Sequence, residues 1–429
     1  MVRSLVLSVA FIVCCLVQPA FALLEIEISQ GVESALPIAI TATSSDDSAE
    51  TRLITQVISA DLHRSGLLGV VEQGRYPTGL INKKQVEYQA WRDKGIEALL
   101  VVSTQPISAD QYQVEFFLYD LVRNKRYLAH SVNSNSQSLR RVAHKIADVV
   151  FESLVGLRGA FSTRIAYITE MGIGKKRQYV LKVADADGHN PLSVFISNKQ
   201  LMSPVWSSNG SKLAYVSFEN ERSEIFIQDM ASGKREKISS APGLNSAPAW
   251  SPNDQQLALT LSQDGDPNIY ILDLKSGNKR QLTSHYGIDT EPTWSADGRS
   301  IYFTSNRSGS PQIYKLSIST GKAERISFDG RYNAAAALSP NGELLAMVHN
   351  DGKGYRIGVL DLRSDSFQVI TNGDLDEAPS FAPNGSMIIF STRRSGSTIL
   401  SAVSADGRVQ QQFRLQSGKV REPTWSPFR

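Results

Sequence analysis

Cysteine is confined to the start of this 429-residue chain, where Cys14 and Cys15 are the only two. The rest of the chain therefore offers no thiolate metal site, no cysteine nucleophile and no disulfide. Long hydrophobic runs are also lacking after residue 22, since no later stretch reaches the roughly 18 apolar residues of a membrane-spanning helix. The formal net charge of +3 is too small to indicate nucleic acid or an anionic membrane as a partner.

Signatures of catalysis are absent as well. The sequence contains no G-x-S-x-G elbow, no P-loop and no H-E-x-x-H pair. Its histidines are scattered without the spacing of metal ligands: His63, His130, His144, His189, His285 and His349. We therefore expect no enzyme activity, no cofactor and no metal, and a structural role for His144 on its helix.

The first 22 residues have the layout of a secretory signal peptide. Arg3 precedes an apolar run from Leu5 to Val17, and Ala20-Phe21-Ala22 follows as an A-x-A cleavage site. The run is short of the roughly 20 residues that a transmembrane helix needs, so we expect cleavage after Ala22. An uncleaved anchor is the alternative. A cleaved leader before a chain without a membrane span predicts the bacterial periplasm, or secretion.

The chain is rich in one repeated phrase, exemplified by SPVWSSNGSKLAYVS at 203–217 and EPTWSADGRSIYFTS at 291–305. An aromatic or apolar residue recurs at spacings of 44, 44, 44, 43 and 44, at Trp206, Trp250, Trp294, Leu338, Phe381 and Trp425. An Asn-Gly or Asp-Gly pair follows in most units and predicts a tight hairpin. Four short strands in each period are typical of a β-propeller blade, so we expect the recurring aromatic residues in its core.

The two ends of the repeat region complement each other. Residues 164–203 begin with RIAYITE and supply a second, third and fourth strand without an inner strand. The chain ends with EPTWSPFR, an inner strand with nothing after it. Together they predict one blade closed by the C-terminal strand, which gives six blades and leaves no open sheet edge at the closure.

The region before the repeats has no such period and predicts a small α/β domain. Strands are expected at 23–29, 37–43 and 96–104, and a hairpin turning near Asn124. Helices are expected at 44–66, 82–94 and 136–155, with Leu53 and Val149 on apolar faces. The predicted organisation is a signal peptide at 1–22, an α/β domain at 23–160 and a six-bladed propeller at 161–429.

The stretches just before the inner strands gather charged residues at one rim of the propeller. They place six side chains near the channel mouth: Asp289, Glu291, Asp376, Glu377, Arg421 and Glu422. Loops on a rigid scaffold often carry function, so a polar, partly acidic funnel that docks a protein or a ligand is one interpretation. Turn formation by the Glu-Pro pairs alone is the other.

These features resemble the TolB family of the bacterial Tol–Pal system over essentially the whole chain after the leader. The residues that carry the resemblance are GAFSTRIAY at 159–167, LMSPVWSSNGSKLAYVSFE at 201–219, TEPTWS at 290–295, FAPNG at 381–385 and the terminal EPTWSPFR. The resemblance implies a monomeric, non-enzymatic periplasmic scaffold. Its implied partners are the peptidoglycan-associated lipoprotein Pal, at the channel mouth, and TolA, through the small domain. The implied role of this envelope complex is to maintain outer-membrane integrity and to support constriction during cell division.

The family's functional residues map onto particular positions of this chain. Its Pal contacts correspond to Leu244, Ala247, Thr290 and Glu291, to which the rim adds Glu377 and Glu422. Leu244 departs from the family pattern, in which a histidine is familiar. The family's N-terminal switch, which docks at the domain interface or is released for TolA, matches the start of the expected α/β domain: Leu23, Leu24, Glu25, Ile26, Glu27 and Ile28.

Three alternatives remain open from the sequence. The N-terminal segment could instead form a permanent edge strand of the small domain. The propeller could bind peptidoglycan or another carbohydrate directly, with Tyr286 and Tyr332 as the nearby aromatic residues. A propeller hydrolase or lyase is the third class, and it would need catalytic side chains converging in the channel.

Overall fold

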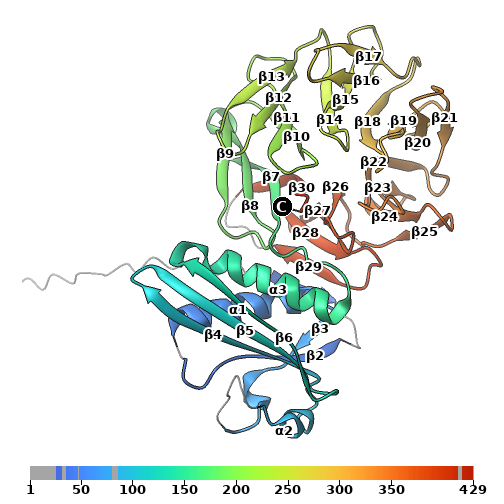
Figure 1. The fold of residues 1–429 in the computed structure, drawn as a ribbon. Coiled ribbons are helices and arrows are strands. Elements are labelled where there is room, and N and C mark those ends of the chain that lie inside the picture. Colours follow the sequence, from blue (N-terminus) through green and yellow to red (C-terminus); the bar gives the residue numbers. More distant parts are fainter. Residues whose placement is uncertain (1–25, 31–34, 47, 80–85, 414–417, 429) are drawn as a thin grey trace, which may run out of the picture.

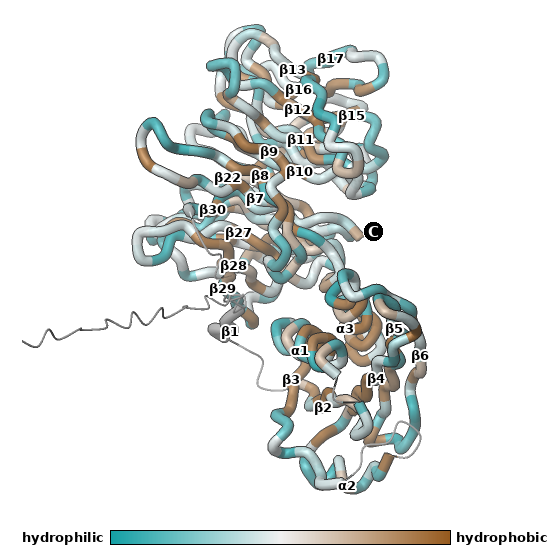
Figure 2. Tube along the Cα trace, turned by 90° about the vertical axis from the view of Figure 1, so that its left-hand side faces the viewer, coloured by the Kyte–Doolittle hydropathy of each residue, from teal (hydrophilic) through white to brown (hydrophobic). Residues whose placement is uncertain are grey.

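The structure is a computed structural model that describes residues 26–30, 35–46, 48–79, 86–413 and 418–428. Within these ranges the chain forms a small α/β domain and a β-propeller (Figure 1). The helices α1 and α3 lie at the end of the small domain that faces the propeller, as the turned view in Figure 2 also shows. No helix in the described ranges is long and apolar enough to cross a bilayer.

The small domain contains one five-stranded sheet in the order β3-β2-β4-β5-β6. Its strands are β2 (Leu36–Ala42), β3 (Leu68–Val70), β4 (Ala98–Ser108), β5 (Gln111–Asp120) and β6 (Lys125–Asn135). The helices are α1 (Ala49–Arg64), α2 (Tyr88–Arg92) and α3 (Leu139–Val155). Alternate residues of the sheet face two cores, because successive strand side chains point to opposite sides. One core contains the apolar faces of α1 and α3, and the other contains Trp91 of α2.

The helices differ from their predicted limits in ways that have local causes. Helix α1 begins at Ala49 because the hydroxyl of Ser48 accepts the Thr51 N–H at 3.2 Å and caps the first turn. Helix α2 is shorter than the predicted 82–94, of which 82–85 lie outside the described residues. Leu53 and Val149 belong to the predicted apolar faces, but these two residues are 37% and 36% exposed.

The propeller has six blades of four antiparallel strands each, as predicted. Blade one contains β10 (Leu201–Trp206), β11 (Lys212–Ser217), β12 (Glu224–Asp229) and β13 (Arg235–Ser239). Blade two contains β14 (Asn245–Trp250), β15 (Gln256–Leu261), β16 (Asn268–Asp273) and β17 (Lys279–Gln281). Blade three contains β18 (Asp289–Trp294), β19 (Ser300–Ser305), β20 (Gln312–Ser317) and β21 (Ala323–Arg325).

Blade four contains β22 (Tyr332–Leu338), β23 (Leu344–Asn350), β24 (Arg356–Asp361) and β25 (Ser366–Val369). Blade five contains β26 (Asp376–Phe381), β27 (Met387–Arg394), β28 (Ser397–Ser404) and β29 (Gln410–Phe413). Blade six joins the C-terminal strand β30 (Lys419–Trp425) to β7 (Arg164–Met171), β8 (Gln178–Asp185) and β9 (Leu192–Ser197). Pairing of Trp425 with Ile165 closes the ring, which confirms the predicted closure.

The recurring aromatic residues lie in the core, as expected. Five of the six repeat positions are buried: Trp206, Trp250, Trp294, Phe381 and Trp425. Two of the indoles also join neighbouring blades by hydrogen bonds. The Trp250 N–H donates to the Val205 carbonyl at 3.3 Å, and the Trp294 N–H donates to the Ala249 carbonyl at 3.1 Å. The repeated aromatic residue therefore serves both the core and the contact with the preceding inner strand.

The first described strand, β1 (Ile26–Gln30), does not belong to the small domain's sheet. It pairs antiparallel with β29, with Ile26 opposite Phe413 and Ile28 opposite Gln411, and so becomes a fifth strand of blade five. The interpretation of this segment as an edge strand of the small domain is therefore wrong. Residues Leu23, Leu24 and Glu25 of the predicted tail lie outside the described residues.

Candidate functional site

The inner strands of all six blades share a backbone irregularity at the same place. Each inner strand loses its register with its neighbour there, between the second and fifth strand residues in most blades. The residue at this bulge has a positive φ between 46° and 54° at Ser203, Ala247, Glu291, Ala335, Ala378 and Glu422. Such a conformation is unfavourable for residues with a side chain, so its recurrence marks a feature that the surrounding structure imposes.

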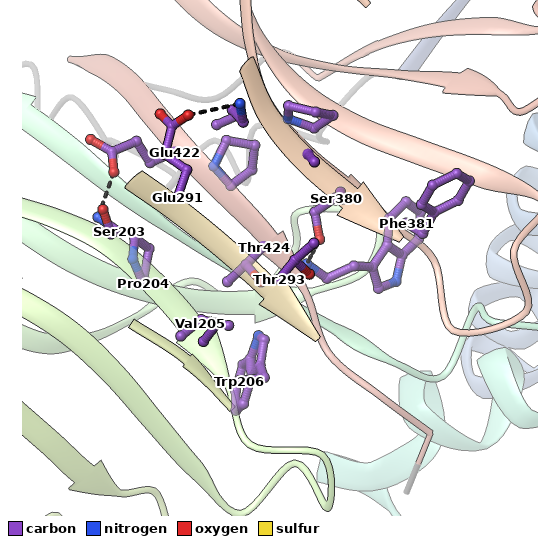
Figure 3. A pocket seen from close by; sticks show the side chains of 18 of the residues that line it. Ser203, Pro204, Val205, Trp206, Glu291, Thr293, Ser380, Phe381, Glu422 and Thr424 are labelled. Atoms are coloured by element: carbon purple, nitrogen blue, oxygen red, sulfur yellow. Dashed lines mark hydrogen bonds between the residues drawn. The ribbon is translucent and has the colours of Figure 1, made fainter. Parts of the chain in front are cut away.

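Two bulge residues carry carboxylates that bond to the next blade around the ring. Glu291 accepts the backbone N–H of Ala335 at 2.8 Å and the hydroxyl of Thr304 at 2.8 Å. Glu422 accepts the backbone N–H of Ser203, and Figure 3 shows this carboxylate between the two inner strands. Each glutamate thus satisfies the bulge N–H of its neighbour, and the ring is joined through side chains as well as through packing.

The bulges surround a cavity of about 1120 Å³ in the centre of the propeller. Prolines and alanines supply much of its wall, including Pro204, Pro248 and Pro292. Among the described residues that line the cavity, the charged ones are Glu291, Glu377 and Glu422. The channel is therefore a largely apolar funnel with negative charge, which favours hydrogen-bond donors and cationic groups over anions.

The electrostatics of the channel disfavour further negative charge. Burial raises the pKa of Glu422 to about 7, and Glu377 adds to this rise, while the Ser203 N–H and Arg421 partly oppose it. Burial likewise raises the pKa of Tyr332 to about 12, with Glu291 and Glu377 adding to the effect. Near neutral pH, Glu422 is therefore distributed between its neutral and charged forms.

Six residues are predicted to bind a partner at the rim, and the structure brings four of them together in the channel wall: Ala247, Glu291, Glu377 and Glu422. Leu244 lies on the rim with its side chain 37% exposed, and its N–H donates to the Ser262 hydroxyl at 2.8 Å. The hydroxyl of Thr290 is 3.3 Å from that of Thr260. Leu244 and Thr290 are therefore not among the residues that line the cavity.

Two other residues predicted at the rim are structural. Asp289 is fully buried, and its carboxylate pairs with Arg307 at 2.7 Å. Asp376 is 1% exposed and accepts a hydrogen bond from the Thr392 hydroxyl at 2.5 Å. Both side chains tie an inner strand to the second strand of its own blade or to the loop after it, so the expectation that they line the funnel is wrong.

The aromatic residues near the mouth fall into two kinds. Tyr286 is 82% exposed beside the rim. Tyr332 lines the channel and packs edge-on against Tyr355, with ring centroids 5.2 Å apart. Sequence reasoning missed Tyr355 because it comes from the loop before β24, outside the repeated phrase. It also missed the ring formed by the six bulge residues, which we call the bulge ring, although a proline follows the bulge residue in five of the six blades.

Known protein families match both parts of the chain. The family profile described as the TolB amino-terminal domain matches residues 24–127, and the profile described as the TolB beta propeller domain matches residues 151–429.

Individual relatives match over nearly the full length. A protein of Thioalkalivibrio sulfidiphilus named Tol-Pal system protein TolB is 54% identical over 431 residues, covering 100% of this chain and 98% of the relative. A protein of the same name from Xanthomonas campestris pv. campestris is 50% identical over 410 residues, covering 95% of this chain and 93% of the relative. The crystal structure of TolB from Acinetobacter baumannii is similar, with a TM-score of 0.88 and 34% identity over 95% of this chain and 100% of that one.

Proposed function

The chain belongs to the TolB family of Tol–Pal system proteins, and from this membership we propose that it is a non-enzymatic scaffold of the bacterial periplasm. Its proposed partners are the peptidoglycan-associated lipoprotein Pal and the inner-membrane protein TolA. Through them it maintains outer-membrane integrity and aids envelope constriction during division. The proposal includes cleavage of the leader after Ala22 and action as a monomer.

The channel mouth supports the proposal that Pal docks there. A funnel whose walls are proline and alanine, with three carboxylates, offers shape and charge complementarity to a protruding segment of a partner protein. Leu244 and Tyr286 add exposed apolar surface beside the mouth. The described lining residues include no histidine, lysine or arginine that could stabilise an oxyanion beside the three carboxylates, which favours binding over turnover.

The N-terminal segment supports a separate role toward TolA. Strand β1 is attached to the propeller by antiparallel backbone pairing to β29. A segment of this kind can leave one sheet edge and add to another, because the backbone bonds are similar in both places. We propose that residues 23–28 bind TolA when this segment is released.

A binding titration tests the proposed function. We expect Ala247→Leu, which fills the mouth, and Leu244→Glu, which charges its rim, each to weaken the binding of purified Pal at least tenfold. The matched control is Ala231→Leu, at the exposed turn between β12 and β13 on the opposite end of the blade. Melting temperatures should change little, because Leu244 is exposed and Ala247 faces the cavity, where a larger side chain has space.

The outcomes separate the alternatives. Unaltered Pal affinity in both variants would refute the proposal that Pal binds at the mouth. Binding of muropeptides alone would support the carbohydrate interpretation. The same titration with TolA and a chain lacking residues 23–31 tests the released segment. Full TolA affinity without these residues would refute that part of the proposal.

A further inference from the structure

A buried cluster of charged residues joins the small domain to the propeller. His144 of α3 and Asp61 of α1 are 2% and 1% exposed, and Asp187 in the turn between β8 and β9 is 6% exposed. The first two residues belong to the small domain and the third to blade six. Burial of ionisable groups is costly unless they are paired, so their pairing decides how firmly the two domains hold together.

The imidazole of His144 lies between the two carboxylates. Its Nδ1 is 2.6 Å from Asp61 Oδ2, and its Nε2 is 3.7 Å from Asp187 Oδ2. Within the described residues, Nε2 has no hydrogen-bond partner. A neutral imidazole carries one N–H and can donate to only one of the carboxylates, whereas an imidazolium carries two and can donate to both.

Basic side chains from three elements lie beside the same carboxylates. On α1, Arg64 Nε donates to Asp61 Oδ1 at 3.1 Å, and its Nη1 donates across the interface to the Ala186 carbonyl at 3.1 Å. On α3, Arg140 pairs with Asp187. In the turn of blade six, His189 Nδ1 is 3.3 Å from Asp187 Oδ2.

A further acidic group near the cluster is Asp148 of α3, which interacts with Asp61. Its carboxylate accepts the backbone N–H of Phe161 at 2.7 Å and of Ser162 at 3.2 Å. Burial raises the pKa of Asp148, and the nearby Asp61 adds to this rise, while the two backbone N–H groups oppose it. Arg64 and Arg140 already pair with Asp61 and Asp187, and we assign no metal to the cluster.

We propose that His144 is a proton-controlled latch between the two domains: as an imidazolium it bridges Asp61 of the small domain to Asp187 of the propeller, and as a neutral ring it releases one of them. The latch does not depend on the identity of the partners proposed above. It adds a pH response to the contact between the domains.

The direction of the response follows from the surroundings of His144. Burial alone would lower the pKa of His144, and Arg64 acts in the same direction, but the carboxylates of Asp61 and Asp187 outweigh both and raise it above its usual value. A pKa that is raised in the folded protein stabilises the joined state fully below the ordinary imidazole pKa of about 6.5. This stabilisation is lost as the pH rises through the raised value, so the domains separate more readily in alkaline conditions.

Hydrogen exchange of the purified protein tests the latch. Exchange is measured from pH 5 to 9 and normalised for the intrinsic pH dependence, in peptides covering 61–66 and 185–189. We expect wild-type protection to fall by up to about tenfold per pH unit above pH 6.5, since one proton is linked to the contact. His144→Gln should show low protection without this pH dependence. His63→Gln, which alters an exposed histidine of α1 next to the cluster residues Asp61 and Arg64 in sequence, should behave like the wild type.

Other outcomes would overturn the proposal. Protection that is independent of pH in the wild type, or an equal pH response in His144→Gln, would show that His144 is not the switch. Loss of protection on adding EDTA at pH 6 would indicate that a bound metal ion, and not a proton on His144, holds the two domains together. If His144→Gln fails to fold, nuclear magnetic resonance of the histidine rings in the wild type decides: an imidazole at His144 that is already neutral at pH 6 refutes the latch.

Discussion

Replacement of Glu422 by glutamine should remove a pH dependence from the stability of the propeller. In the folded protein, burial raises the pKa of Glu422 to about 7, whereas an unfolded glutamate titrates near about 4.3. Between these values the folded state holds a proton that the unfolded state has released. Raising the pH through this window therefore destabilises the protein, by at most about 1.4 kcal/mol per pH unit.

Glutamine retains the shape of the side chain and an oxygen that can accept the Ser203 N–H, but it cannot ionise. At pH 8 we expect Glu422→Gln to be more stable than the wild type by on the order of 2 kcal/mol, after allowing for solvent in the channel. For a chain of this size such a gain raises the melting temperature by several degrees. At pH 4 the two proteins should melt together.

Calorimetric melting at pH 4, 5, 6, 7 and 8 measures the effect. The control is Glu291→Gln, which removes the carboxylate at the same position of blade three. The proposed response of His144 is present in all three proteins and cancels in the differences between them. If the wild type and Glu422→Gln give parallel curves of melting temperature against pH, then burial does not perturb Glu422 and our account of the channel electrostatics is wrong.

Two further predictions concern contacts between parts of the fold. Trp294→Ala should lower the free energy of unfolding by about 3–5 kcal/mol, because the indole is 8% exposed. Trp294→Phe should lose about 1 kcal/mol with its bond to Ala249, and a Trp294→Phe variant as stable as the wild type in denaturant titrations would deny the hydrogen bond a role. Gly66→Ala should loosen the small domain from the propeller, because Gly66 has a φ of +70° and the new Cβ would lie 2.3 Å from a methyl carbon of Val409. Faster proteolysis of residues 156–161, which connect the two domains, would measure the loosening, and an unchanged rate would contradict it.

The propeller was predictable from the sequence because its information is repeated. The spacing of Trp206, Trp250 and Trp294 gives the length of one blade. The incomplete units at 164–203 and 422–429 predict that the C-terminal strand closes the ring. Both follow from strand alternation and turn residues, which are local properties. The family profiles and relatives support the resemblance carried by the same phrases.

Long-range pairing could not be predicted in the same way. The alternating residues of β1 indicate a strand, but nothing local shows that its partner is β29, almost 400 residues later. His144 likewise reads as one residue on the apolar face of a helix, and its carboxylate partners come from another helix and another domain. Asp289 and Glu291 lie two residues apart, yet one is fully buried and the other lines the channel, because the bulge alters the alternation between them.

The bulge ring also shows how a repeat can produce an uneven site. Blades three and six carry Glu291 and Glu422, and the blades that follow each of them, with Ala335 and Ser203, have their bulge N–H groups bonded to these carboxylates. The pattern therefore occurs twice around the ring. Glu377 has no acidic counterpart in blade two, where the equivalent residue is a serine.

Glu377 thus departs from the two-fold pattern, places a third carboxylate near Glu422 and adds to the rise in the pKa of that residue. Two of the three channel carboxylates, Glu377 and Glu422, therefore lie in blades five and six, with Arg421 partly opposing their effect on Glu422. A partner that enters the funnel meets an oriented field instead of a symmetric one. Its rotation about the channel axis is then fixed by charge as well as by shape.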